Sequence, residues 1–235
     1  MPESSAIRAM FGQIARRYDL ANHVLSGGMD RWWLRCLIKK VARLQPTRIA
    51  DLATGSGDVA FALSRKISSA QVHGLDFCEP MLSEARRKLA DGAGDPARIK
   101  FSLGDCLALP LPDNSIDAVT IAYGVRNFEK RAQGLSEIHR ILRPGGTAFI
   151  LEFTQPWLWF RPFYYFYLRF LLPGIARLAT GNRHAYDYLV ASIARFPDRK
   201  NFAKELKEIG FTEISHAGLT ASIVAIHQAR KAPES

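Results

Sequence analysis

The chain has 235 residues, of which 48% are hydrophobic, so one large domain with a sizeable buried core is expected. Its three cysteines lack Cys-x-x-Cys spacing, which argues against a disulfide framework and a zinc site, and no metal is expected. The formal net charge of +10 favours an anionic partner (nucleic acid, a lipid surface or an acidic ligand), although a merely basic soluble protein would carry it too.

The N-terminal part is predicted to be helical. Apolar residues recur at helical spacing over residues 4–20 and again over residues 29–44, with a glycine pair between the two segments. We expect residues 1–45 to form a helical cover or lid. The N-terminus lacks a basic region followed by an apolar one, so we expect no signal peptide and a cytoplasmic location.

Short apolar strands alternate with amphipathic helices from residue 46 to residue 156. The expected strands are 47–53, 70–76, 98–104, 116–123 and 147–153, and the expected helices are 58–67, 79–91 and 130–142. Such an alternation predicts an α/β, doubly wound core, in which a parallel sheet carries helices on both faces.

The C-terminal part is predicted to end in an antiparallel hairpin. Two helices, 184–195 and 198–209, precede the strands 211–217 and 222–229. Only residues 218–221 link these strands, and so short a link cannot hold a crossover helix, so the strands must be antiparallel. A mostly parallel, seven-stranded sheet with one reversed hairpin, over residues 210–231, separates the methyltransferase version of this fold from the dinucleotide version.

The segment 49–58 is predicted to be a buried strand, a tight turn and a helix start. Gly55 and Gly57 let the backbone approach a ligand, and the helix start offers unpaired N–H groups to an anionic group. The spacing Gly55-x-Gly57-x-x-Ala60, followed by Asp76, also fits the dinucleotide fingerprint. The turn alone therefore leaves three alternatives: a site for a dinucleotide, a site for S-adenosylmethionine, or a plain turn that binds no ligand.

Acidic residues mark three neighbouring strand ends, where a doubly wound sheet binds its ligand: Asp51, Asp76 and Asp105. A carboxylate that closes the second strand can accept hydrogen bonds from both ribose hydroxyls. One that closes the third can reach an adenine amino group, with the Cys106 N–H available to a ring nitrogen. A dinucleotide needs only the second acid, so S-adenosylmethionine is favoured over NAD. A turn cap is the alternative role for Asp105.

Residues 157–178 form the most aromatic part of the chain. Four arginines and no acid lie between Phe153 and Tyr186. Arginines and prolines interrupt the apolar run, which argues against a membrane span of about 20 apolar residues. Arginine among aromatics is typical of a segment at a membrane interface, whereas a helix pair that covers the sheet or a substrate pocket is the alternative. We expect residues 157–209 to form a helical insert that faces substrate or membrane.

Several motifs form a recognisable set: Tyr18-Asp19-x-x-Asn22-x-x-Leu25-Ser26, Gly124-Val125-Arg126-Asn127-Phe128, Arg143-Pro144-Gly145-Gly146 running into Leu151-Glu152-Phe153, and Leu219-Thr220-x-x-Ile223-Val224-Ala225-Ile226-His227. Together they resemble the ubiquinone/menaquinone biosynthesis C-methyltransferases, over nearly the whole chain. The resemblance implies a class I S-adenosylmethionine-dependent enzyme. Such enzymes methylate a ring carbon of a polyprenylated quinol, giving menaquinol from its demethyl precursor or the equivalent benzoquinol.

The sequence departs from the family pattern at a few positions. Methionine is usual where Ala21 stands, histidine where Asp30 stands, and a glycine where the hairpin carries Ala221-Ser222. The first two departures affect the contacts of the N-terminal lid, and no catalytic role is assigned to Asp30. The cofactor-binding residues expected from strand ends and resemblance together are Asp51, Gly55, Ser56, Gly57, Asp76, Asp105, Cys106 and Ala122.

The chemistry of ring methylation suggests catalytic residues. A ring carbon is a poor nucleophile until the adjacent hydroxyl loses its proton, and a phenol pKa near 10 leaves little phenolate at neutral pH. Arg126 is expected to stabilise the oxyanion, and a salt bridge with Glu129 or Glu152 is the alternative. The predicted catalytic set is Arg126, Asn127 and Tyr186, with Tyr123 and Asp187 as further candidates.

The implied substrate carries a prenyl tail that lies in lipid, so residues 157–178 are expected to form a tail channel or a dock on the inner face of the membrane. A homodimer or a quinone-biosynthesis complex is a further possible partner. Other classes stay open: a methyltransferase for another lipophilic molecule or RNA, or a non-catalytic cofactor-binding scaffold. The loop of Asn/Asp-Pro-Pro-aromatic type that amine methylation uses is absent after the fourth strand, so no nucleic acid partner is expected.

Overall fold

The computed structural model of the protein describes residues 23, 26–171 and 183–234, and of residues 171 and 183–187 it describes only the backbone. The helix predicted over residues 4–20 lies outside this part of the chain.

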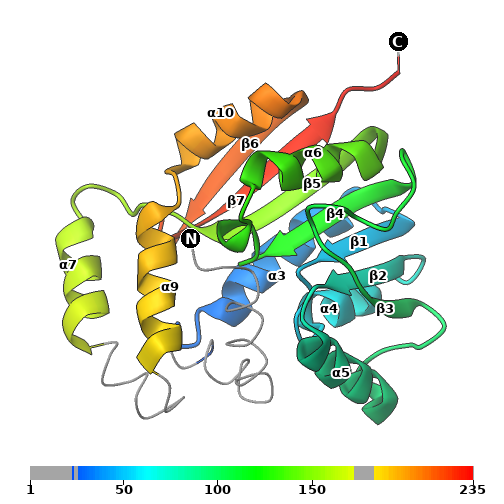
Figure 1. The fold of residues 1–235 in the computed structure, drawn as a ribbon, viewed down its shortest axis with the longest axis horizontal. Coiled ribbons are helices and arrows are strands. Elements are labelled where there is room, and N and C mark those ends of the chain that lie inside the picture. Colours follow the sequence, from blue (N-terminus) through cyan, green and yellow to red (C-terminus); the bar gives the residue numbers. More distant parts are fainter. Residues whose placement is uncertain (1–22, 24–25, 172–182, 235) are drawn as a thin grey trace.

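The described residues form a seven-stranded sheet with the order β3-β2-β1-β4-β5-β7-β6 (Figure 1). Its strands are β1 (Arg48–Leu52), β2 (Gln71–Asp76), β3 (Ile99–Leu103), β4 (Ile116–Ala122), β5 (Leu142–Phe153), β6 (Phe211–Leu219) and β7 (Val224–Lys231). The first five strands run parallel, whereas β7 pairs antiparallel with both β5 and β6. The predicted parallel sheet with a reversed C-terminal hairpin is confirmed.

Helices cover both faces of the sheet. They are α3 (Asp30–Ala42), α4 (Asp58–Lys66), α5 (Glu79–Lys88), α6 (Arg131–Ile141), α7 (Arg161–Phe166), α9 (Arg183–Arg195) and α10 (Arg199–Ile209). Side chains of α3, α4 and α5 pack with Ile49 of β1 in one core, and side chains of α6 and α10 pack with Ala50 in the other. Successive strand residues point to opposite faces, and both faces of β1 are apolar because both are covered.

The helical insert lies beyond one end of the sheet, where α7 and α9 run side by side (Figure 1). Tyr164 and Leu168 are buried there against Val190 of α9. In the aromatic segment 157–178, helix α7 begins at Arg161, and after Phe166 it continues as a π-helical turn over Tyr167–Leu171. The rest of the predicted segment, from residue 172 to residue 178, lies outside the described residues.

Two element boundaries differ from the prediction. The strand expected to begin at residue 147 begins at Leu142, because Leu142 already pairs with Ile116 before the register shifts at the Pro144-Gly145-Gly146 breaker. The hairpin turn is shifted to residues 220–223, since β6 extends two residues beyond its predicted end and β7 begins two residues after its predicted start.

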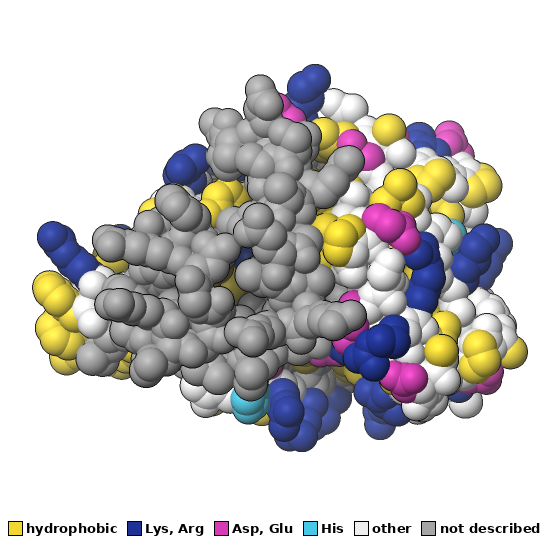
Figure 2. All heavy atoms as spheres, turned by 60° about the horizontal axis from the view of Figure 1, so that its bottom comes forward, with side chains coloured by type: hydrophobic (Ala, Val, Ile, Leu, Met, Phe, Trp, Pro, Cys, Tyr) yellow, Lys and Arg dark blue, Asp and Glu magenta, His cyan; other side chains and the backbone are white. Residues whose placement is uncertain are grey.

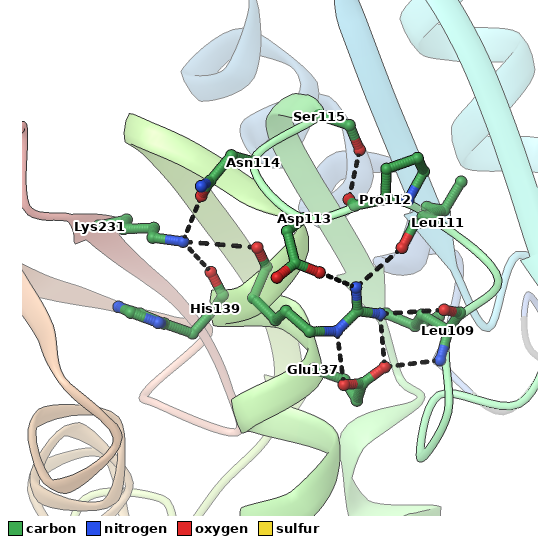
Figure 3. A network of polar contacts seen from close by, with 10 residues as sticks. Leu109, Leu111, Pro112, Asp113, Asn114, Ser115, Glu137, His139 and Lys231 are labelled. Atoms are coloured by element: carbon green, nitrogen blue, oxygen red, sulfur yellow. Dashed lines mark hydrogen bonds and ion pairs between the residues drawn. The ribbon is translucent and has the colours of Figure 1, made fainter.

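A polar network lies at the end of the sheet where β4 begins (Figure 3). Arg140 of α6 makes ion pairs with Asp113 and Glu137, at 2.6 and 2.7 Å, and donates to the carbonyl groups of the loop before β4. Lys231, at the end of β7, donates to Asn114 of the same loop at 2.7 Å. These contacts stabilise the end of the sheet opposite to the strand ends that carry the predicted acids.

Candidate active site

The glycine turn follows β1 and leads into α4. The Gly57 N–H donates to the Thr54 carbonyl at 2.9 Å, and Gly57 is the N-cap residue of α4 with φ +89°. A Cβ atom at Gly57 would lie 2.8 Å from ring atoms of both Phe61 and Phe101. Both the backbone conformation and the lack of space therefore require glycine at this position.

Asp76, at the end of β2, is bound to this turn. Its carboxylate accepts from the N–H groups of Gly55 and Cys78, each at 2.9 Å, and its side chain is buried. Burial raises the pKa of Asp76, and hydrogen bonds from the backbone of Cys78, Gly55 and Phe77 oppose that rise. The carboxylate is thus held at the edge of the glycine turn with acceptor capacity left for ligand hydroxyls.

Asp51 links the turn to the neighbouring strand. Its two oxygens accept from the hydroxyls of Thr54 and of Thr120 on β4, both at 2.6 Å. Only 1% of its surface is exposed, and burial raises its pKa to about 6. Asp51 thereby joins the turn to β4, beside Asp76.

A cavity of about 110 Å³ lies at these strand ends. Of the predicted cofactor residues, the cavity is lined by Asp51, Gly55, Ser56, Asp76 and Ala122. Gly57 follows these turn residues as the N-cap of α4. The carboxylates can accept from ribose hydroxyls, and the helix start offers N–H groups to a carboxylate ligand. These residues fit an adenosyl cofactor that bears an amino-acid group.

Asp105 and Cys106 lie after the neighbouring strand β3 and do not line this cavity. Asp105 is exposed, and it accepts from the Leu107 N–H at 2.8 Å, the turn-capping contact that was its alternative role. Cys106 is buried close to the Ala53 backbone, and burial raises the pKa of its thiol to about 12. An adenine contact from either residue stays a prediction.

Arg126 forms a buried ion pair with Glu152. It lies in the short 3₁₀ helix after β4 (Val125–Asn127), and its Nη1 is 2.6 Å from Oε1 of Glu152. The same Nη1 donates to the Tyr123 carbonyl at 2.6 Å, and the guanidinium stands over the Phe153 ring at 5.4 Å. Of the two salt bridges considered from the sequence, the Glu152 pair is present. It balances the charge of Arg126.

A second, larger cavity of about 380 Å³ is mostly apolar. Aromatic side chains from four parts of the chain line it: Trp33, Tyr123, Phe153, Phe160 and Tyr164. Arg126 is among its few charged lining residues. Tyr123 and Asp30 line both cavities, so the polar cavity and the apolar one adjoin at these two residues.

The backbone is strained where the two cavities meet. Tyr123 and Ala53, which follow β4 and β1, adopt positive φ angles of 58° and 50°. A Cβ atom at Gly124 would lie 2.6 Å from that of Ala53, so the two strand ends are in close contact. Left-handed non-glycine residues are uncommon and concentrate at functional sites.

The sequence prediction missed two residues of this region. The first is Tyr188, whose hydroxyl donates to Oδ1 of Asn127 at 2.9 Å, while Asn127 itself lines the polar cavity as predicted. Burial raises the pKa of Tyr188. The side chains of Tyr186 and Asp187, which were predicted instead, lie outside the described residues. The second is Asp30, to which the sequence analysis assigned no catalytic role and which lines both cavities.

Within residues 23, 26–171 and 183–234, no group of three or more His, Cys, Asp or Glu side chains is arranged to hold a metal ion. No helix in that part of the chain combines the length and apolar character needed to cross a membrane.

The model of the ubiE/COQ5 methyltransferase family matches residues 2–231. The chain belongs to this family. It is a class I S-adenosylmethionine-dependent C-methyltransferase of quinone biosynthesis, with S-adenosyl-L-methionine as its cofactor.

Curated relatives agree with this assignment. The chain is 40% identical to "Ubiquinone/menaquinone biosynthesis C-methyltransferase UbiE" of Geobacter sp. (strain M21) over 96% of each chain. It is also 40% identical to "Demethylmenaquinone methyltransferase" of Beutenbergia cavernae, over 96% of this chain and 90% of that one.

Solved structures share the fold at low sequence identity. The [4+2]-cyclase SpnF has a TM-score of 0.72 and 16% identity, with coverage of 100% of this chain and 98% of that one. A possible histamine N-methyltransferase of Thermotoga maritima has a TM-score of 0.65 and 16% identity, with coverage of 95% and 99%.

Proposed function

We propose that the enzyme methylates a ring carbon of a polyprenylated quinol, converting demethylmenaquinol to menaquinol, or acting on 2-methoxy-6-polyprenyl-benzoquinol. The observation that supports this most is the apolar cavity of about 380 Å³, lined by aromatic rings, that adjoins the polar cavity at Tyr123. A flat aromatic ring suits such a cavity, since stacked or edge-on ring contacts add to the burial of apolar surface. The names of the relatives point to the same substrates.

In this proposal Asp76 accepts from the ribose hydroxyls and the turn with Gly55 and Ser56 holds the amino-acid group. Asp105 and Cys106 would contact the adenine. When bound, the cofactor supplies an electrophilic methyl group. The chain's contribution is to hold the ring beside that group and to exclude water, which the aromatic wall of the second cavity does.

Arg126 is proposed to stabilise the negative charge that develops on the ring oxygen. Its guanidinium lines the apolar cavity, and it carries five N–H donors. Because Glu152 balances its charge, Arg126 would act as a fixed hydrogen-bond donor rather than as a free cation. Asn127, held by Tyr188, would orient a ring hydroxyl, and Tyr186 remains a candidate for contact with the quinol.

The prenyl tail is proposed to leave through the insert toward a membrane surface. Six large apolar side chains of the insert are between 46% and 76% exposed: Trp157, Leu158, Trp159, Phe163, Phe166 and Phe170. In Figure 2 hydrophobic side chains gather at the left edge of the face shown, where α7 lies in Figure 1. Phe163 both lines the apolar cavity and is exposed, so the cavity reaches this surface.

In this proposal, four segments of the chain have different roles. Residues 1–45 would cover the site as a lid and residues 46–156 would bind the cofactor. Residues 157–209 would receive the quinol tail as a peripheral membrane contact, and residues 210–231 would close the sheet. Thr220 and Ile223 of the hairpin turn line the apolar cavity, and Thr220 accepts from the Trp33 indole at 2.8 Å.

The experiment that tests the function is a turnover panel with labelled cofactor. The purified enzyme is given short-chain demethylmenaquinol, 2-methoxy-6-prenyl-benzoquinol and RNA in separate reactions. We expect label in at least one quinol and none in RNA. Label in RNA alone would contradict the proposal, and an absence of label in every arm would favour the scaffold role.

A further inference from the structure

Asp30, the first residue of α3, stands where the polar and apolar cavities adjoin. Among the described residues it shares this place only with Tyr123. Its side chain is 16% exposed, so it is largely withdrawn from solvent. A carboxylate at this junction faces the position where a ring in one cavity meets a cofactor in the other.

One oxygen of Asp30 is held in place by two neighbours. Oδ1 accepts from Nδ1 of His23 at 2.9 Å and from the hydroxyl of Ser26 at 3.0 Å. Because a carboxylate only accepts, Nδ1 of His23 carries the hydrogen. Within the described residues, no hydrogen bond or ion pair joins the other oxygen, Oδ2, to the protein. That oxygen has lone pairs available for a proton.

Among the described residues, the other polar groups that line the two cavities are poorer candidates for taking a proton from a ring in the apolar cavity. Asp58 lines only the polar cavity, and its Oδ1 is paired with Nζ of Lys88 at 2.9 Å. Arg126 is paired with Glu152 and cannot accept a proton. Tyr123, Tyr164 and Tyr167 line the apolar cavity, and a neutral phenol is a weak base. Asp51 and Asp76 line only the polar cavity, where threonine hydroxyls and backbone N–H groups already bind their oxygens.

From this placement we infer that Asp30 is the general base that takes the proton of the ring hydroxyl, and that His23 is a positioning residue that orients it. The inference rests on the proposed quinol substrate. The O–H bond breaks, its electron pair stays on the ring oxygen, and the proton joins Oδ2. The oxygen then donates electron density to the adjacent ring carbon. That carbon would form its bond to the methyl group as the methyl–sulfur bond of the cofactor breaks, and the sulfur would keep the electron pair and leave as S-adenosylhomocysteine. The ring carbon then loses its hydrogen as a proton to water, and Asp30 returns its own proton to the oxygen.

The atoms and charges of this sequence balance. The ring exchanges one hydrogen for one methyl group, and a single proton is released to water. Asp30 is again a carboxylate at the end, and His23 keeps its hydrogen throughout. A positioned general base contributes about 10²- to 10⁴-fold to the rate.

The first test is Asp30→Asn, measured at saturating cofactor. We expect kcat to fall by about 10²- to 10⁴-fold, with a melting temperature close to wild type. The matched control is Asp91→Asn, which removes one exposed carboxylate that is paired with Arg87. The control is expected to keep the wild-type kcat. A wild-type kcat in Asp30→Asn would overturn the inference.

A second test does not depend on turnover. Wild type and Asp30→Asn are titrated with a short-chain hydroxynaphthalene and with its methyl ether, and the ratio of the two dissociation constants is taken. We expect the preference for the hydroxyl ligand to fall about fivefold in the variant, because a charge-assisted hydrogen bond becomes a neutral one. The ratio is independent of the folded fraction of the sample. An unchanged ratio would overturn the inference even if the enzyme acts on another substrate.

The role of His23 is tested by rescue. His23→Leu removes the donor to Asp30 and is expected to lower kcat about tenfold, whereas His23→Gln, which carries an N–H donor, should recover most of that loss. Equal kcat values in the two variants would contradict a positioning role. Failure of wild type in every quinol reaction would overturn the proposed function, and the binding ratio would still decide whether Asp30 contacts a ring hydroxyl.

Discussion

Arg126 and Glu152 form an ion pair at the inner wall of the apolar cavity, with Nη1 and Oε1 2.6 Å apart and side chains 5% and 1% exposed. Two strand ends bring them together. Glu152 lies on β5, and Arg126 follows β4, which pairs with β5. The pair keeps a guanidinium in apolar surroundings, since a buried charge without a partner is costly.

Arg126→Ala should therefore affect both stability and turnover. Leaving Glu152 buried without its partner should lower the free energy of unfolding by about 3–5 kcal/mol. Cofactor affinity should stay near wild type, because Arg126 does not line the polar cavity, while most turnover should be lost. Urea unfolding, calorimetry and initial rates measure the three quantities.

The double variant Arg126→Met with Glu152→Gln separates structure from chemistry. It removes both charges at once, so stability should recover, whereas turnover should stay low. If turnover recovered together with stability, Arg126 would have only a structural role.

Gly57→Ala should destabilise the glycine turn and weaken cofactor binding. The new Cβ would meet two phenylalanine rings at 2.8 Å, at a residue with φ +89°. Gly92→Ala is the matched control, because Gly92 has φ +88° but a Cβ added there would have no atom within 4 Å. The control should cost only the backbone strain of about 1–2 kcal/mol, and Gly57→Ala more. Equal losses of stability in both variants would show that close packing at Gly57 is unimportant.

The raised pKa of Asp51 predicts a pH dependence of stability. Burial raises this pKa to about 6 in the folded protein, so the folded state binds the proton more tightly than the unfolded chain. The free energy of unfolding should therefore fall as pH rises from about 4 to about 6, by at most about 1.4 kcal/mol per pH unit, and then level off.

Urea titrations of wild type and Asp51→Asn across this range provide the measurement. The pKa of Asp76 shifts in the same direction in wild type, and its charge also raises the pKa of Asp51, so the difference between the two profiles reports Asp51 together with this coupling. A difference that grows with pH in favour of wild type would contradict the assignment.

The insert combines exposed aromatic side chains with arginines, which predicts that it binds anionic vesicles. Replacement of Arg161 and Arg169 by Glu should reduce co-sedimentation with such vesicles, since each basic residue near the surface contributes about 1 kcal/mol. Arg48→Glu with Arg65→Glu changes the net charge equally at exposed sites away from the insert and serves as control. Equal loss of binding in both double variants would mean that overall charge, rather than the insert, drives adsorption.

Much of the fold could be predicted, because the spacing of apolar residues that distinguishes strands from helices can be seen within a short stretch of sequence. The glycine turn, Asp51 and Asp76 were located by the rule that ligands lie at strand ends, and the structure brings them to one cavity. The same rule named Asp105, whose side chain accepts from the Leu107 N–H of its own turn and does not line that cavity, so its contact with the adenine stays a prediction. A strand end fixes where a residue lies but not where its side chain points.

The residues that were missed depend on long-range packing. Tyr188 reaches Asn127 only because α9 packs beside the 3₁₀ helix after β4. The spacing of residues along the sequence does not indicate such a contact. Asp30 reads as an ordinary acid in the first turn of a helix, where it suits the helix dipole. Its place at the junction of two cavities follows from the packing of α3 against α4 and β5.

The central claim is that the methyl group is attached to a ring carbon of a quinol held in the apolar cavity. The direct measurement is mass spectrometry of the product formed from short-chain demethylmenaquinol and cofactor with a trideuterated methyl group. We predict a mass increase located in the ring, with the hydroxyl groups still free to be acetylated. A trideuteromethyl ether on oxygen, or unlabelled quinol with label in another class of molecule, would contradict it.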